Sequence, residues 1–203
     1  MKDLTRIILA SASPRRLELL RSLRLEVDVI PSRYREPSID RFTPSELASV
    51  HAREKALEVR LRADHAPIVA ADTIVDLDGT ALGKPRDAAD AARMLGLLSG
   101  REHIVHSAFA LMDSTRDAIF EHCESTRVTF FKLGDREIAD YVESGEPMDK
   151  AGAYGIQGFG ATLVERIDGD FYTVMGFPLA HFVRASRRMG FLLHPAKNAD
   201  IIK

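Results

Sequence analysis

The alternation of hydrophobic and polar positions predicts a strand and a helix at the start of the chain. Arg6 to Ala10 is a short, mostly apolar run typical of a buried strand. Ser13 and Pro14 then favour a helix start, because the serine hydroxyl can cap a free backbone amide. Proline suits the first helical position, because the N–H that it lacks would have no partner within the helix. Glu26 to Pro31 alternates like a second strand.

The next part of the chain predicts two helices around a buried strand. Thr43-Pro44-Ser45-Glu46 is a capping box, and the helix that it opens runs to about Arg62. The apolar stripe of this helix is expected to comprise Leu47, Val50, Leu57 and Leu61. Pro67 to Leu77 is a nearly continuous apolar run, which indicates a strand buried on both faces. After a turn at Asp78-Gly79, the segment from Asp87 to Leu98 predicts a capped helix.

The second half of the chain predicts mainly antiparallel strands. The expected elements are a strand pair at His103–Met112 and Ile119–Phe131, a helix at Asp135–Val142, a hairpin of Ala161–Ile167 and Phe171–Met175 around Asp168-Gly169-Asp170, and a helix from Phe177 to about Met189. No repeat or linker-like stretch separates the two halves. We therefore expect one domain over residues 1–203 with a shared sheet, and a loose tail at about 191–203.

Composition and charge narrow the classes of function. The net charge of -2 argues against a general nucleic-acid or acidic-membrane binder, because such proteins carry a basic excess. The single cysteine, Cys123, cannot form an internal disulfide, which fits a reducing compartment. The apolar run near the N-terminus is too short for a secretion signal, and no other stretch could span a bilayer. We predict a cytoplasmic protein without nucleic-acid or membrane partners.

Asp72 is the most informative single residue for function. It interrupts the apolar segment IVAADTIV, where an unpaired charge would be costly to bury. A structural ion pair and a functional carboxylate explain this position about equally well on the strand pattern alone.

Arg15 and Arg16 lie in the first turn of a helix, where the helix dipole disfavours positive charge. Free backbone amides and two guanidinium groups together form a coherent phosphate site. The alternative is that both arginines point into solvent, at a cost of about 1 kcal/mol or less. The surrounding ASASPRR is neither a Walker A loop nor GxGxxG, so a P-loop NTPase and a Rossmann dehydrogenase are not supported.

Four further residues lie at the edges of the expected elements. Lys55 on the second helix could be an ordinary solvent-reaching lysine, whereas Lys84 is held in a short loop by Pro85. Glu36 could help Asp72 hold Mg²⁺, or could be a solvated loop acid. The loop AGAYGIQGFG is either a ligand-binding segment, with Gln157 able to recognise a base, or a glycine-rich connection.

The ordered set of motifs resembles the Maf nucleoside triphosphate pyrophosphatases. The motifs are LASASPRRLELL, the glutamate after the second strand, AREKA, ADTIV, GKPRD, DKAGAYGIQGFG and GFPL, and they span roughly Ile7 to Arg187. The resemblance implies an elongated α/β fold with a mixed β-sheet, flanking helices and two lobes around a central cleft, related to the inosine triphosphate pyrophosphatases. It also implies hydrolysis between the α and β phosphates, giving monophosphate and pyrophosphate, with Mg²⁺ or Mn²⁺.

Carried over to this sequence, the resemblance assigns roles to individual residues. It makes Asp72 the general base or a metal ligand together with Glu36, and it places Ser11, Arg16, Lys55 and Lys84 around the phosphates. It makes Arg15, Thr73 and Gln157 specificity positions, and these three residue types match the subgroup that acts on dTTP and UTP. We call Ser11, Arg15, Arg16, Glu36, Lys55, Asp72, Thr73, Lys84 and Gln157 the nominated residues.

Two expectations remain beside the enzyme. The alternative function is a nucleotide-binding regulator of septum formation and cell division without significant turnover. The partners that the resemblance implies are the nucleoside triphosphate substrate and, as in other members of the family, a second copy of the chain in a homodimer. The possible substrates include modified pyrimidine nucleotides.

Overall fold

A computed structural model describes residues 1–37, 42–63, 66–113, 115 and 118–194. Its strands are β1 Lys2–Asp3, β2 Arg6–Leu9, β3 Glu26–Val29, β4 Ile68–Leu77, β5 Thr80–Leu82, β6 Glu102–Asp113, β7 Ala118–Phe130, β8 Val164–Asp168 and β9 Phe191–Leu192. Its α-helices are α1 Pro14–Ser22, α2 Pro44–Arg60, α3 Ala88–Leu98, α4 Asp135–Glu143, α5 Phe171–Met175 and α6 Leu179–Arg188. Three short 3₁₀ helices follow α4, η1 Glu146–Asp149, η2 Ala151–Ala153 and η3 Gly158–Leu163.

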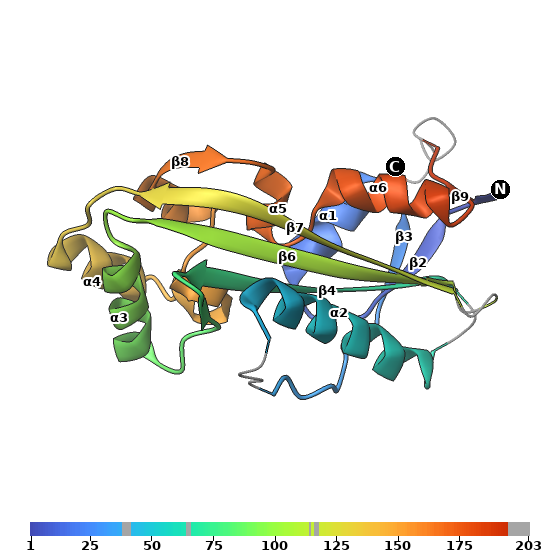
Figure 1. Cartoon of the computed structure of the whole chain (residues 1–203), viewed down its shortest axis with the longest axis horizontal. Coiled ribbons are helices and arrows are strands. Elements are labelled where there is room, and N and C mark those ends of the chain that lie inside the picture. The colour runs from blue at the N-terminus through green and yellow to red at the C-terminus, as the bar shows by residue number, and fades with distance from the viewer. Residues whose placement is uncertain (38–41, 64–65, 114, 116–117, 195–203) are drawn as a thin grey trace.

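One mixed sheet joins both halves of the chain, as the sequence predicts. Its strand order is β3-β2-β4-β6-β7-β8, and β5 pairs with β4. The strands β2, β3 and β4 are parallel, whereas every later pairing in this sheet is antiparallel. Figure 1 shows the long strands β4, β6 and β7 running along an elongated molecule. The predicted α/β class with flanking helices is therefore confirmed.

The helices cover the sheet on both faces. Figure 1 shows α2 along one face, α1 and α6 at the opposite side, and α3 with α4 at one end. Ala70 and Ile74 of β4 pack with α2 residues, whereas Val69 and Ala71 pack with residues of α1 and α6. Because side chains alternate along a strand, Asp72 faces α2 and Thr73 faces the opposite side. We call these sides the α2 face and the α1/α6 face.

The capping box at the start of α2 is confirmed, but the predicted apolar stripe of this helix is correct only in part. The Thr43 hydroxyl accepts a hydrogen bond from the Glu46 amide, and the Glu46 carboxylate accepts one from the Thr43 amide. Leu61, which was expected in the stripe, is 88% exposed. The fully buried side chains that pack on the sheet are Ala48, Ala52, Ala56 and Val59, and the predicted Leu47 and Leu57 pack beside them, partly buried. The small alanine side chains let the helix approach the sheet closely, which brings its longer polar side chains near β4.

The predicted hairpin around Asp168-Gly169-Asp170 is also wrong. Val164–Asp168 is a strand, but Phe171–Met175 forms the helix α5 instead of a second strand. The Asp170 carboxylate accepts hydrogen bonds from the Thr173 amide and hydroxyl. An Asp at this position serves a helix start as well as a turn, and here the N-cap bond decides between them.

The first residues of the predicted loose tail belong to a strand, so the prediction is wrong for them. Phe191 and Leu192 form β9, which pairs in parallel with Lys2 and Asp3 of β1. The rest of the predicted tail, residues 195–203, lies outside the described residues. Within the described ranges, no helix combines the length and the apolar character needed to cross a membrane.

Candidate active site

A cleft of about 700 Å³ lies between the first and second halves of the chain. The loop after β2, the start of α1, the segment after β3, α2 and β4 contribute one part of its lining, and the η1–η3 region with α5 contributes another. All of the nominated residues line this cleft: Ser11, Arg15, Arg16, Glu36, Lys55, Asp72, Thr73, Lys84 and Gln157. The structure thus brings together residues that lie up to 146 positions apart, from Ser11 to Gln157.

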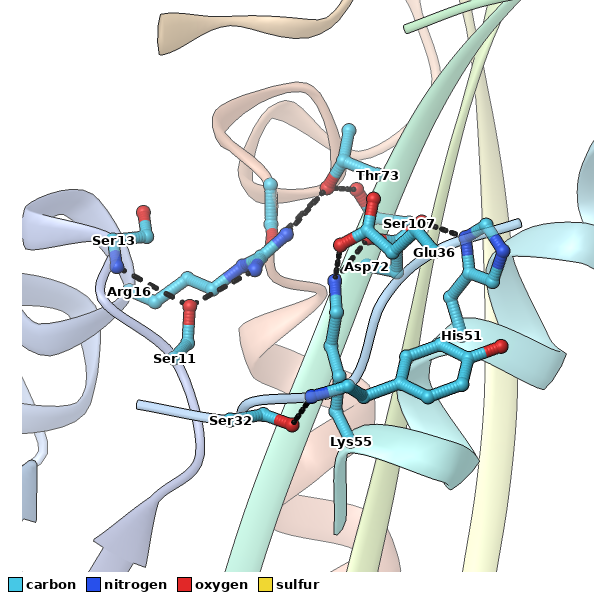
Figure 2. Close-up of polar contacts among 12 residues, drawn as sticks. Ser11, Ser13, Arg16, Ser32, Glu36, His51, Lys55, Asp72, Thr73 and Ser107 are labelled. Carbon is cyan, nitrogen blue, oxygen red and sulfur yellow. Dashed lines mark hydrogen bonds and ion pairs between the residues drawn. The ribbon is translucent and has the colours of Figure 1, made fainter. Parts of the chain in front are cut away.

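Asp72 is buried at the floor of the cleft and has a cationic partner. Its side chain is 9% exposed, and its Oδ1 lies 2.6 Å from Lys55 Nζ. The same Lys55 ammonium lies 2.5 Å from Glu36 Oε1. Lys55 therefore contacts both carboxylates at once, and Figure 2 shows it reaching them from α2. Of the two explanations for Lys55, the solvent-reaching lysine is wrong, because its side chain is only 11% exposed.

His51 is a member of this cluster that the sequence reasoning missed. Its Nδ1 lies 3.4 Å from Asp72 Oδ2, and its Nε2 lies 3.3 Å from the Pro37 carbonyl oxygen. His51 precedes Lys55 by one turn of α2, so both side chains leave the helix on the same side. The four-residue spacing in HAREK was the signal that could have identified it.

The environment keeps Asp72 ionised. Burial opposes its charge, but the His51 hydrogen bond and the charges of Lys55 and Arg16 hold the pKa of the Asp72 carboxyl below its ordinary value. Burial likewise acts to lower the pKa of His51, but the hydrogen bond and charge of Asp72 outweigh it and raise that pKa. The floor of the cleft is therefore a charged cluster that satisfies itself internally.

Arg16 crosses to the α1/α6 face of β4 and holds a second polar network. Its guanidinium donates to Ser11 Oγ at 3.1 Å, to Thr73 Oγ1 at 3.1 Å and to the Gly176 carbonyl at 3.0 Å. Thr73 Oγ1 also lies 2.8 Å from Ser107 Oγ (Figure 2). The loop after β2, two strands and the end of α5 thus fix the direction of Arg16. Ser107 and the Gly176 carbonyl were not predicted. Gly176 begins the GFPL motif, whereas nothing in the local sequence marks Ser107.

The N-terminal end of α1 carries Ser13 and Arg15, and neither neutralises the positive end of the helix dipole. Arg15 forms an ion pair with Asp149 of η1, with 3.2 Å between Nη1 and Oδ2. Ser13 is the N-cap residue, but its side chain makes no cap hydrogen bond, so the predicted capping role of its hydroxyl is wrong. Instead, Ser11 Oγ accepts from the Ser13 amide at 3.2 Å. The first turn of α1 contains no acidic residue either. The helix end therefore keeps its positive character on the cleft.

Lys84 and Gln157 complete the lining at exposed positions. Lys84 lies in the loop after β5, and Gln157 immediately precedes η3. Neither side chain forms an ion pair or hydrogen bond with the described residues. Both remain available to a molecule in the cleft.

Three side chains on the α2 face could hold a metal ion. One donor atom each of Glu36, His51 and Asp72 lies within 4.8 Å of the others. Two carboxylate oxygens and one imidazole nitrogen suit a divalent cation, with the oxygens favoured by Mg²⁺ and Mn²⁺. The Lys55 ammonium against both carboxylates shows that this pair is organised around positive charge.

A family model and several related sequences match nearly the whole chain. The family model "Maf-like protein" matches residues 6–189. A dTTP/UTP pyrophosphatase from Geobacter metallireducens is 47% identical over 95% of this chain and 100% of its own length. A dTTP/UTP pyrophosphatase from Bacillus velezensis is 48% identical over 89% of this chain and 94% of its own length. A solved HAM1 protein from Coxiella burnetii is 20% identical, with a TM-score of 0.49 and coverage of 90% of this chain and 98% of that one.

Proposed function

The chain belongs to the Maf family, and from that membership we propose that it is a nucleoside triphosphate pyrophosphatase acting on dTTP and UTP. The reaction cleaves the bond between the α and β phosphates and gives the nucleoside monophosphate and pyrophosphate. The observation that carries the proposal is one cleft lined by a buried carboxylate, that of Asp72, and by four cationic side chains, those of Arg15, Arg16, Lys55 and Lys84. An anionic substrate is held there locally, although the whole chain has a net charge of -2.

The positive side chains bind the triphosphate from several directions. Arg16 is fixed by three acceptors and presents its charge beside the uncapped start of α1, where backbone amides favour an anion. Lys84 is exposed in the loop after β5 and can reach the phosphates from there. Lys55 can exchange a carboxylate for a phosphate oxygen when substrate enters. Together these groups offset charge that develops on the leaving pyrophosphate.

Asp72 orients the attacking water and contributes to metal binding. A carboxyl group whose pKa is held low is a weak base near neutral pH, so orientation of the water contributes more than full proton removal. Glu36 and Asp72, with His51 beside them, would hold Mg²⁺ or Mn²⁺. When bound, the metal supplies positive charge to the phosphate oxygens and polarises them.

Selection of the base falls to the rim of the cleft. Gln157 is exposed there and can both donate to and accept from a pyrimidine edge. Arg15 must share its guanidinium with Asp149, which sets the direction from which it meets the nucleotide. Thr73 acts less directly, because its hydroxyl already contacts Arg16 and Ser107. We therefore assign Thr73 to positioning Arg16 and assign base selection to Arg15 and Gln157.

Product analysis with the full chain tests this function. We expect pyrophosphate release from dTTP and UTP that requires Mg²⁺ or Mn²⁺, and a decrease of about 10²- to 10⁴-fold in Asp72→Asn. Circular dichroism of the variant checks that the fold is retained. Nucleotide binding without pyrophosphate release by the wild type would instead support the regulator, and orthophosphate with a diphosphate would indicate a phosphatase. Preference for a purine nucleotide, such as 7-methyl-GTP, over dTTP and UTP would contradict the assigned specificity.

A further inference from the structure

A second cluster of metal-binding side chains lies outside the catalytic cleft. His122 and Glu124 are two positions apart on β7 and therefore lie on the same face of the sheet. His181 reaches them from α6. The Nε2 atoms of His122 and His181 lie 3.1 Å and 3.3 Å from Glu124 Oε2. None of the three residues lines the cleft.

These spacings match the edges of a metal coordination shell. One donor atom from each residue lies within 4.8 Å of the other two. A tetrahedral zinc ion with bonds of about 2.0–2.1 Å separates neighbouring donors by roughly 3.3 Å, close to the two nitrogen–oxygen distances in this cluster. The donor spacing therefore suits an ion of this size, and the two imidazoles would turn from Glu124 toward it.

The rings are held in place but remain accessible. The imidazoles of His122 and His181 stack with their centroids 4.4 Å apart and an interplanar angle of 19°. The Phe109 ring supports His122 from the sheet, with a centroid distance of 5.8 Å. The side chains of His122 and Glu124 are each 29% exposed and that of His181 is 39% exposed, so an ion and its remaining water ligands can reach the site.

The buried nitrogen of His181 sets what metal binding must outweigh. His181 Nδ1 is buried without a hydrogen-bond partner among the described residues, so the proton favours Nε2, which lies 3.3 Å from Glu124 Oε2. A metal on Nε2 requires the proton to lie on Nδ1, where it would have no acceptor. Coordination of the ion must therefore outweigh the lost Nε2–Glu124 hydrogen bond and one unsatisfied buried N–H.

We propose that His122, Glu124 and His181 form a binding site for a transition-metal ion of the Zn²⁺ type. Two imidazoles and one carboxylate suit such ions better than Mg²⁺, which prefers oxygen ligands. Three protein ligands leave a position for water, as in exchangeable zinc sites. The ion would fasten α6 to β7. Since α6 begins three residues after Gly176, whose carbonyl accepts from Arg16, the ion would also restrain one support of the catalytic cleft.

Zinc titration of the full chain by calorimetry, with excess Mg²⁺ present, tests the site. We expect the wild type and Asp72→Asn each to bind one equivalent of Zn²⁺. His122→Gln and His181→Gln should bind this ion at least about 100-fold more weakly, because loss of even a supporting partner weakens metal sites by about 10- to 100-fold. His194→Gln is the matched control. Its imidazole is 37% exposed and contacts one carboxylate, that of Asp3, at 2.9 Å.

Two further measurements keep the test decisive. Circular dichroism checks the fold of each variant, and Glu124→Gln offers a third way to remove a ligand if a histidine variant fails to fold. Co²⁺ added to the wild type is expected to give visible absorption bands that His181→Gln lacks. Equal Zn²⁺ stoichiometry and affinity in wild type and His181→Gln would overturn the proposal. So would a zinc equivalent that is lost only in Asp72→Asn, because that ion would belong to the catalytic cleft.

Discussion

Replacement of Lys55 by methionine tests whether the two carboxylates of the cleft are organised around a cation. The Lys55 ammonium lies 2.5 Å from Glu36 Oε1 and 2.6 Å from Asp72 Oδ1. Methionine keeps much of the apolar stem and removes the charge. The variant therefore leaves two carboxylates near each other, one of them 9% exposed, without the ammonium between them.

The expected loss of stability follows from the burial of each partner. Removing one member of a buried ion pair costs about 3–5 kcal/mol, because the remaining charge stays desolvated. Glu36 is 49% exposed and contributes little, whereas Asp72 keeps the hydrogen bond from His51 and the charge of Arg16. We therefore expect the free energy of unfolding of Lys55→Met to fall by about 3 kcal/mol, at the lower end of that range.

A divalent metal ion should restore part of the stability that Lys55→Met loses. A metal ion that binds only the folded chain stabilises it, and each tenfold gain in affinity adds about 1.4 kcal/mol at saturating concentrations. Lys55 competes with the metal for the same two carboxylates in the wild type. Saturating Mg²⁺ should therefore stabilise Lys55→Met by at least about 1 kcal/mol more than it stabilises the wild type.

Urea unfolding followed by circular dichroism, with and without Mg²⁺, measures both effects. Lys84→Met is the matched control, because Lys84 lines the same cleft but is exposed and has no ion pair with the described residues. Its free energy of unfolding should stay within about 0.5 kcal/mol of the wild type. Equal destabilisation of the two variants, or equal stabilisation of both by Mg²⁺, would refute the reasoning.

Two other predictions concern the end of the sheet near α3 and α4. Burial lowers the pKa of His103 from 6.5 to about 4, so the unfolded chain binds a proton at higher pH than the folded chain does. The free energy of unfolding should therefore fall by up to about 3 kcal/mol as the pH is lowered from 6.5 to 4. His103→Gln should lack this part of the pH dependence when its free energy of unfolding is measured in urea. If the difference in stability between this variant and the wild type is the same at every pH, the prediction is wrong. Gly160→Ala should cost about 1–3 kcal/mol, because the new Cβ would lie 2.4 Å from the Gly155 carbonyl oxygen. Thermal unfolding should show little change in Gly83→Ala, whose Cβ would meet no atom within 4 Å, and equal losses in the two variants would exclude this explanation.

Local sequence signals correctly predicted helices that begin with a hydrogen bond between near neighbours in the chain. The Thr43–Glu46 capping box and the Asp87 cap are present as expected, because these bonds form between near neighbours in the chain. The expected hairpin at Asp168-Gly169-Asp170 failed because the same residue types serve turns and helix caps. The predicted stripe of α2 was correct only in part: Leu47 and Leu57 pack beside the sheet, but close contact with the sheet favours the alanines.

The candidate site divides in a similar way. Every nominated residue lines one cleft, although their roles in catalysis, phosphate binding and specificity stay predictions. His51, Ser107, Asp149 and the Gly176 carbonyl were missed, since each matters through a partner far away in the chain. The homodimer and the cytoplasmic location also stay predictions.

The sequence by itself determined that a carboxylate lies in an apolar strand and that two arginines follow a serine and a proline at a helix start. Composition and short-range patterns suffice for this, because burial and capping act between near neighbours. Only the tertiary structure decided how the two arginines differ. Arg16 turns inward to Ser11, Thr73 and Gly176, whereas Arg15 meets Asp149. Those directions depend on strands and loops that fold back over long distances, and a one-dimensional pattern cannot specify them.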